Sequence, residues 1–120
     1  MTQYLLSVHT AADGAPPSMS DEEMAQGMEP VAALEAEMRD ANALVFSGRL
    51  AEASSATVVR KANGRVTMTD GPFVEAKEQI AGFYVVDAAN LDQAVDWASR
   101  TSEAIGMPIE VRPFFAVAEG

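Results

Sequence analysis

The sequence predicts an α+β domain in which two helices cover one face of a mostly antiparallel sheet. Three observations support this fold class. Strand-like runs lie near both ends of the chain, two amphipathic segments have helical spacing, and a hairpin signal lies between them. We expect residues 1–120 to form a single domain, because this length suits one ordinary hydrophobic core.

The first half of the chain predicts a strand followed by a long helix. Residues Gln3 to His9 are apolar on both faces of a strand, so both faces should be covered. Ser20-Asp21-Glu22-Glu23 has the spacing of a capping box and begins the helix. Pro30 interrupts it, so we expect a kink or a break into two helices there. The helix carries one apolar stripe, formed by Met24, Met28, Val31, Leu34 and Met38.

The middle of the chain predicts four further strands. Ala43 to Leu50 suggests the second strand, and Thr57 to Arg60 and Arg65 to Thr69 form a pair. Asn63-Gly64 between that pair is a strong hairpin signal, because both residues tolerate positive φ. Gly82 to Val86 is the next strand, and its glycine marks a bulge or a close approach of another backbone.

The last part of the chain predicts a capped helix and a final strand. Asn90 caps the helix with Gln93 at the third helical position, and Ile109 to Arg112 is the closing strand before Phe114-Phe115. This element order suits a ferredoxin-like sandwich with a bare second sheet face. We expect a homodimer to cover that face and to hold a cavity between or beside the sheets. The predicted buried face of the helix consists of Leu91, Ala94, Val95 and Ala98, with Trp97 at its flank.

The composition narrows the classes of function. Eight basic and eighteen acidic residues give a formal charge of −10, which disfavours nucleic acid and anionic membranes as direct partners. No apolar run approaches the roughly 20 residues that span a bilayer. The absence of cysteine excludes disulfides and thiolate metal sites and fits a cytoplasmic location. We expect no metal and no cofactor, because neither nucleotide-binding glycine motifs nor a multi-histidine pattern is present.

The segment from Asp70 to Glu78 is the candidate functional region. In one interpretation the Asp70 carboxylate only locks its own turn by accepting backbone hydrogen bonds. In the other it lies at the edge of a pocket as a base or a ligand anchor. The charged run at Glu75 and Lys77 is equally open, as a solvated face or as part of the site. The candidate ligand-binding residues are Asp70, Gly71, Pro72, Phe73, Glu75, Lys77, Phe83 and Tyr84.

His9 is the only histidine of the chain, and it lies at the predicted end of the first strand. Its imidazole titrates near neutral pH, so it is a candidate acid or base beside Asp70. The alternative is a strand-end histidine in ordinary hydrogen bonds. The sequence alone does not place the two residues relative to one another.

The central motif resembles a known family. Residues 69–79, Thr-Asp-Gly-Pro-Phe-Val-Glu-Ala-Lys-Glu-Gln, with Gly82-Phe83-Tyr84, look like the signature of the DGPF branch of the YCII-related family. The likeness extends over most of the chain. It implies a ferredoxin-like fold of the dimeric α/β-barrel group, a homodimer and a ligand pocket. Some members of the branch are labelled as transcription initiation proteins or lie beside sigma factors, and the wider family includes a dehydrochlorinase.

One departure from the wider family leaves enzymatic activity open. In that family a histidine opens the first long helix and an Asp-Pro-Tyr-like segment follows the second. This chain has neither, so the family's His–Asp dyad is not carried over. Three hypotheses follow: a dimer that binds a small molecule near Asp70, an acid–base lyase-like enzyme with Asp70 or His9 as the base and Tyr84 as the donor, and an acidic protein that binds a basic partner such as a sigma factor.

Overall fold

The computed structural model describes residues 1–10, 21–72 and 79–115, with side chains from residue 28 onward in the first helix. Its body is a four-stranded sheet in the order β2-β5-β1-β6, formed by β1 (Thr2–His9), β2 (Leu44–Arg49), β5 (Ile80–Ala88) and β6 (Ile109–Pro113). All neighbouring strands of this sheet are antiparallel. The predicted α+β class with a mostly antiparallel sheet is therefore confirmed.

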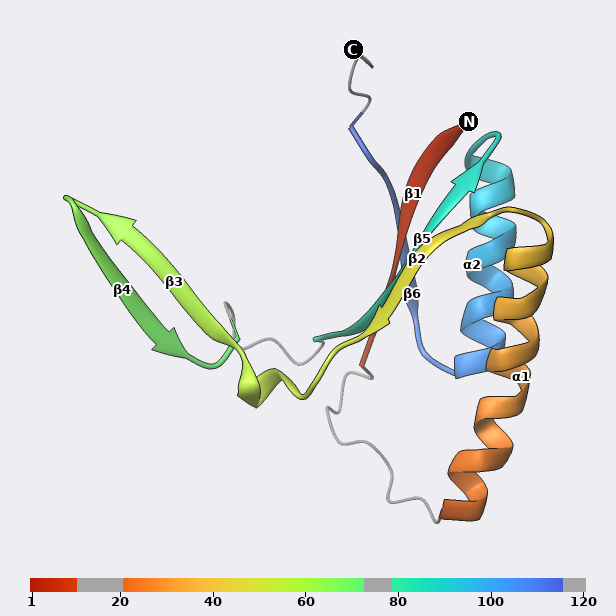
Figure 1. Ribbon diagram of the computed structural model, residues 1–120, viewed down its shortest axis with the longest axis horizontal. Helices are drawn as coiled ribbons and strands as arrows, with labels where there is room; N and C mark the ends of the chain where they lie inside the picture. Colours follow the sequence, from red (N-terminus) through yellow and green to blue (C-terminus); the bar gives the residue numbers. More distant parts are fainter. Residues whose placement is uncertain (11–20, 73–78, 116–120) are drawn as a thin grey trace.

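Both helices lie on the same side of the sheet (Figure 1). They are α1 (Asp21–Asp40) and α2 (Leu91–Ile105). Strand side chains alternate between the two faces of a sheet, so every second residue of β1 and β5 points at the helices. The core lies between the two layers, where burying apolar side chains removes them from water. It consists of Tyr4, Leu6, Val8, Leu34, Met38, Ala43, Tyr84, Val86, Ala88, Ala94, Trp97 and Ala98.

The caps of α2 follow the local sequence. The Asn90 side chain accepts a hydrogen bond from the Gln93 backbone N–H at 2.9 Å, and Gln93 Oε1 accepts one from the Ala89 N–H at 2.7 Å. Gly106 ends the helix in the left-handed region with φ of 80°. The predicted start of this helix is confirmed.

The predicted buried face of α2 is partly wrong. Ala94 and Ala98 are buried as expected, but Leu91 and Val95 are exposed, and the helix buries Trp97 and Thr101 instead. Residues 94, 97, 98 and 101 lie on one face of the helix, and the large indole ring of Trp97 turns that face toward the sheet. Arg100 covers the outer side of the ring, with its guanidinium carbon 4.8 Å from the ring centroid.

Helix α1 is continuous across Pro30, so the alternative of a break into two helices is wrong. The kink stays a prediction. The apolar stripe is buried at Leu34 and Met38, half-buried at Val31 and exposed at Met28. Met24 belongs to the part of α1 whose side chains are not described. The stripe thus leaves the core toward the N-terminal half of the helix.

A second, two-stranded sheet projects away from the body (Figure 1). It is formed by β3 (Thr57–Ala62) and β4 (Arg65–Asp70), and a short 3₁₀ helix, η1 (Ala53–Ser55), precedes it. Asn63 and Gly64 have φ of 53° and 75°, which confirms the predicted hairpin turn. We call the hairpin 57–70 the arm.

The face of the body sheet opposite the helices carries apolar side chains, and we call it the open face. Leu5 of β1 and Phe46 of β2 both pair with Val85 of β5, so these three share it. Phe83 lies on the same face, and its ring centroid is 5.7 Å from that of Phe46. In the part of the chain that the structure describes, no helix is both long and apolar enough to cross a membrane.

Candidate ligand-binding site

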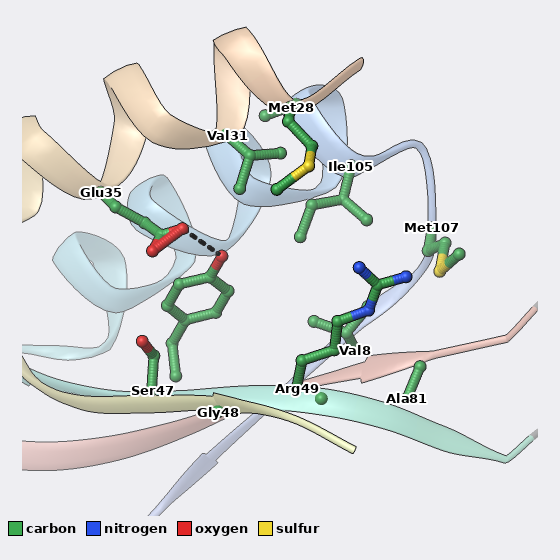
Figure 2. A pocket seen from close by; sticks show the side chains of 13 residues that line it. Val8, Met28, Val31, Glu35, Ser47, Gly48, Arg49, Ala81, Ile105 and Met107 are labelled. Carbon is green, nitrogen blue, oxygen red and sulfur yellow. Dashed lines mark hydrogen bonds between the residues drawn. The ribbon is translucent and has the colours of Figure 1, made fainter. Parts of the chain in front are cut away.

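A cavity of about 590 Å³ lies between α1, the end of α2 and the helix-facing side of the sheet (Figure 2). Its apolar walls come from both layers, with Val8 on β1, Met28 and Val31 on α1, and Ile105 and Met107 at the end of α2. It forms where the α1 stripe leaves the core, so the helix no longer packs tightly on the strands there. Its size and apolar lining are those of a small-molecule site.

Tyr84 and Glu35 form a polar pair in this cavity. Tyr84 lies on β5 and faces the helices, and its hydroxyl donates to Glu35 Oε2 at 3.4 Å (Figure 2). Burial raises the pKa of Tyr84 to about 12, and the charge and hydrogen bond of Glu35 add to the increase. The phenol therefore keeps its proton at neutral pH and acts as a hydrogen-bond donor.

Arg49 ends β2, and its side chain extends across the cavity toward Ile105 and Met107 (Figure 2). Within the described residues, its guanidinium has neither a hydrogen bond nor an ion pair. Glu35, by contrast, has a cationic neighbour outside the cavity, because its Oε1 lies 3.9 Å from an Arg39 nitrogen. The cavity thus has a Tyr–Glu pair on one side, a guanidinium on another and apolar walls between them.

Comparison of the sequence with known proteins identifies the family of this chain. A sequence model of the YCII-related domain matches residues 3–114. The chain belongs to the YCII-related family. It is also 38% identical over 85 residues to a protein of Rhizobium meliloti (strain 1021) that is itself named as uncharacterised, across 71% of this chain and 68% of that protein.

In this YCII-related chain, the described residues of the predicted motif, Asp70, Gly71 and Pro72, lie at the base of the arm. Asp70 is exposed at the end of β4, and its carboxylate has no hydrogen bond to the residues that the structure describes. Gly71 has φ of 99°, which favours glycine, and its N–H donates to the Ala56 oxygen at 2.7 Å. Phe73, Glu75 and Lys77 lie outside the described residues, so a site at Asp70 stays a prediction.

A second cavity, of about 410 Å³, lies beside this turn. Pro72 lines it together with Leu50, Gln79 and Ile80. It is smaller than the first cavity, and Glu52 is the single ionisable residue among the described residues that line it.

His9 lies at the end of β1 in local contacts. Its Nε2 is 3.0 Å from the Ser7 hydroxyl, and the backbone N–H of His9 donates to the Pro108 backbone oxygen at 3.1 Å. Among the described residues it makes no hydrogen bond with Asp70. The Ser7 contact places the imidazole on the open face, on the other side of the sheet from Tyr84. The His9–Asp70 pair stays a prediction.

Phe83 and Tyr84 are neighbours in sequence but lie on opposite faces of β5. Tyr84 lines the larger cavity, whereas Phe83 contacts Phe46 on the open face. Within one subunit they therefore contribute to different surfaces.

Sequence reasoning missed Glu35 and Arg49. Glu35 gives a usable signal, because it lies four residues after Val31 and three before Met38, on the edge of an apolar stripe. Arg49 gives none, since a strand-end arginine is ordinary in sequence and only the packing of α1 and α2 turns it toward a cavity.

Proposed function

We propose that this YCII-related protein binds a small organic anion in the cavity between its helices and its sheet. The observation that carries the proposal is the combination, in one space of about 590 Å³, of apolar walls with Arg49, Glu35 and Tyr84. Ligand sites in proteins are mostly apolar, with a few polar groups that fix orientation.

The lining residues suggest the chemistry of the ligand. The Arg49 guanidinium suits a carboxylate, with which arginine forms paired hydrogen bonds. The Tyr84 hydroxyl donates and the Glu35 carboxylate accepts, so this pair suits a hydroxyl or an amine. Met28, Val31 and Ile105 suit a hydrocarbon chain or a ring between the two ends. A small hydroxy or amino acid with an apolar body meets all three requirements.

Proton transfer is the second candidate function, and the contact between Tyr84 and Glu35 favours it. A ligand held by Arg49 would present its other end to this pair. Glu35 would accept a proton from the ligand, and the Tyr84 hydroxyl, which stays protonated because its pKa is raised, would donate a hydrogen bond to the ligand oxygen on which negative charge develops. In this form the base of the acid–base hypothesis moves from Asp70 or His9 to Glu35, which shares a cavity with Tyr84.

The finer fold assignment forms part of the proposal. The chain has the motif of the DGPF branch, and β1 and β2 are both antiparallel to β5, which lies between them. This order, with two helices on one face, supports a ferredoxin-like subunit of the dimeric α/β-barrel group. The apolar open face supports a homodimer. The absence of cysteine supports a cytoplasmic location.

Two of the hypotheses drawn from the sequence are retained as secondary proposals. The exposed Asp70 carboxylate beside the second cavity supports a ligand anchor at the turn, to be tested in parallel. The charge of −10 supports a basic protein partner, such as a sigma factor.

The test is a thermal-shift screen of small hydroxy and amino carboxylates, followed by calorimetric titration of any compound that stabilises the protein. Arg49→Met removes the guanidinium from the cavity, and Arg65→Met removes the same charge from the exposed arm as a matched control. We expect Arg49→Met to weaken binding by about 10- to 100-fold, since a charge-assisted hydrogen bond is lost, and Arg65→Met to leave it unchanged.

Asp70→Ala is measured with the same ligands to separate the two sites. Binding that survives Asp70→Ala but not Arg49→Met supports the helix–sheet cavity. Binding that survives Arg49→Met but not Asp70→Ala would contradict the proposal and move the ligand to the turn.

A further inference from the structure

Among the residues that the structure describes, no helix or strand of the body packs on the arm. It is a separate two-stranded sheet, every residue of β4 is exposed, and it projects from the body (Figure 1). The radius of gyration is 16.7 Å, whereas a compact chain of this length has about 14 Å. A two-stranded hairpin alone is marginally stable in water, so this one requires a surface to pack on.

The two faces of the arm differ in character. Val59 pairs with Met68 and Lys61 pairs with Val66, so the three apolar side chains share one face. Val59 and Val66 are each 60% exposed, and Met68 is 73% exposed. Arg60 and Arg65 lie on the other face with the threonines of β4. One face of the arm thus carries an uncovered apolar strip, Val59, Val66 and Met68, with Lys61 beside it and Asp70 at its base.

The body has an uncovered apolar surface of its own on the open face. Phe46 is 61% exposed and contacts Phe83, and Leu5 and Val85 continue the surface across the strands. An interface that joins the arm of one chain to the open face of another covers both surfaces at once. Two-fold symmetry makes this exchange reciprocal, so two copies leave neither surface uncovered.

The distribution of charge favours the same partner. The arm holds three basic residues, Arg60, Lys61 and Arg65, and one acidic residue, Asp70, which give it a net charge of +2. The remaining residues then have a net charge of −12. Two chains of charge −10 repel one another. A basic arm that lies on the acidic body of the partner offsets part of this repulsion.

We propose that the arm of each subunit packs its Val59–Val66–Met68 face on the open face of a second copy, at Phe46 and Phe83. This inference rests on the homodimer of the proposed function and specifies how that dimer forms. It is independent of the ligand, because the cavity lies on the other side of the sheet and none of its lining residues belongs to the arm.

The first test is the dimer dissociation constant, measured by sedimentation equilibrium. Met68→Glu places a charge in the apolar strip, and Thr67→Glu places the same charge on the opposite face of the same strand. Burying an uncompensated charge is costly, so we expect Met68→Glu to raise the dissociation constant at least about 10-fold. Thr67→Glu should leave it nearly unchanged.

The second test uses the absence of cysteine in the chain. Phe46→Cys protein is mixed with Met68→Cys protein under mild oxidation, and covalent heterodimers are measured by mass. We expect this mixture to cross-link in preference to Phe46→Cys mixed with Thr67→Cys. Neither substitution introduces a charge, so this test stands even if Met68→Glu does not fold.

The outcomes separate the arm from the dimer. A dimeric wild type that tolerates Met68→Glu and shows no preferred cross-link would overturn the role of the arm while leaving another dimer interface. A monomeric wild type would overturn both and assign the apolar strip to a protein of different sequence. In each case the proposed ligand site is tested separately, by the effect of Arg49→Met on ligand binding.

Discussion

At the scale of single residues, Tyr84 is the group whose chemistry the fold changes most clearly. It occupies a helix-facing position on a central strand, where burial disfavours the phenolate, and the nearby Glu35 carboxylate disfavours it further. The same position at the surface would give an ordinary phenol. The fold thus makes Tyr84 a donor that stays protonated well above neutral pH.

The titration of Tyr84 tests this effect. The folded pKa of about 12 lies above the ordinary value of 10.0, so the folded state holds the proton more tightly. Its contribution to stability is complete below pH 10 and is lost as the pH rises to about 12. Tyrosinate absorbance of the wild type minus that of Tyr84→Phe isolates this group, with circular dichroism recorded to confirm folding.

Glu35→Gln should lower the Tyr84 pKa part of the way, since burial is its largest cause and remains. Glu29→Gln, an exposed change on the same helix, is the control. Ionisation of Tyr84 near its ordinary pKa in the folded wild type would contradict the buried pair.

Local signals in the sequence were sufficient for some residues and not for others. The Asn90 cap and the Asn63-Gly64 turn were predicted correctly, because their geometry depends on a few neighbouring residues. Arg49 and Glu35 were not found, because the site exists only after α1 packs over β2 and β5. The Asp70 turn was found as a motif, and its role still requires measurement.

At the scale of elements, the contact between β2 and β5 explains one glycine. A Cβ at Gly82 would lie 2.9 Å from the Gly48 oxygen, closer than side chains are found. The sequence predicted a bulge or a close backbone approach at Gly82, and the close approach is confirmed; the register with β1 also shifts directly beside this glycine, between Val8 and His9. The same pair of strands positions Arg49 and Tyr84 along the wall of the cavity.

Gly82→Ala should destabilise the protein by about 1–3 kcal/mol, because backbone must shift to admit the methyl group. Gly48→Ala is the matched control on the partner strand, where the added Cβ would lie 3.4 Å from the Phe83 ring and that ring can move. Urea unfolding followed by the fluorescence of Trp97, the single tryptophan, measures both variants. Equal stability of Gly82→Ala and wild type would contradict the close approach.

The error in the predicted buried face of α2 arises from side-chain size. The periodicity of α2 was read correctly, yet Leu91 and Val95 were expected inside and Trp97 at the flank. Hydrophobicity alone does not rank two faces that are both partly apolar. The bulk of the indole ring and the contact of Arg100 with it decide which face turns inward.

At the scale of the whole molecule, the chain divides into a packed body and an arm without a core. The order of strands and helices that forms the body was predicted from the sequence. The projection of the arm was not predicted, because alternating β-branched residues predict a hairpin equally well whether it packs on its own chain or elsewhere.

Hydrogen exchange of the arm should depend on protein concentration. If the arm packs on a second copy, amides of β3 and β4 are protected when the dimer forms and exchange faster on dilution. Amides of β1 and β5, in the centre of the body sheet, should not respond. Mass spectrometry of peptides from both regions over a dilution series measures this. Arm protection that is independent of concentration would contradict packing between copies.

The hydrogen bond from the Leu50 N–H to the Ala81 oxygen, 2.8 Å long, marks the point at which β2 and β5 separate. The arm is an insertion between two strands that are otherwise adjacent and antiparallel. The arm, which is one half of the proposed dimer contact, therefore lies in a different stretch of sequence from the walls of the proposed ligand cavity. The arm can change in length or character without altering the walls of that cavity, so the surface proposed for assembly can change independently of the site proposed for a ligand.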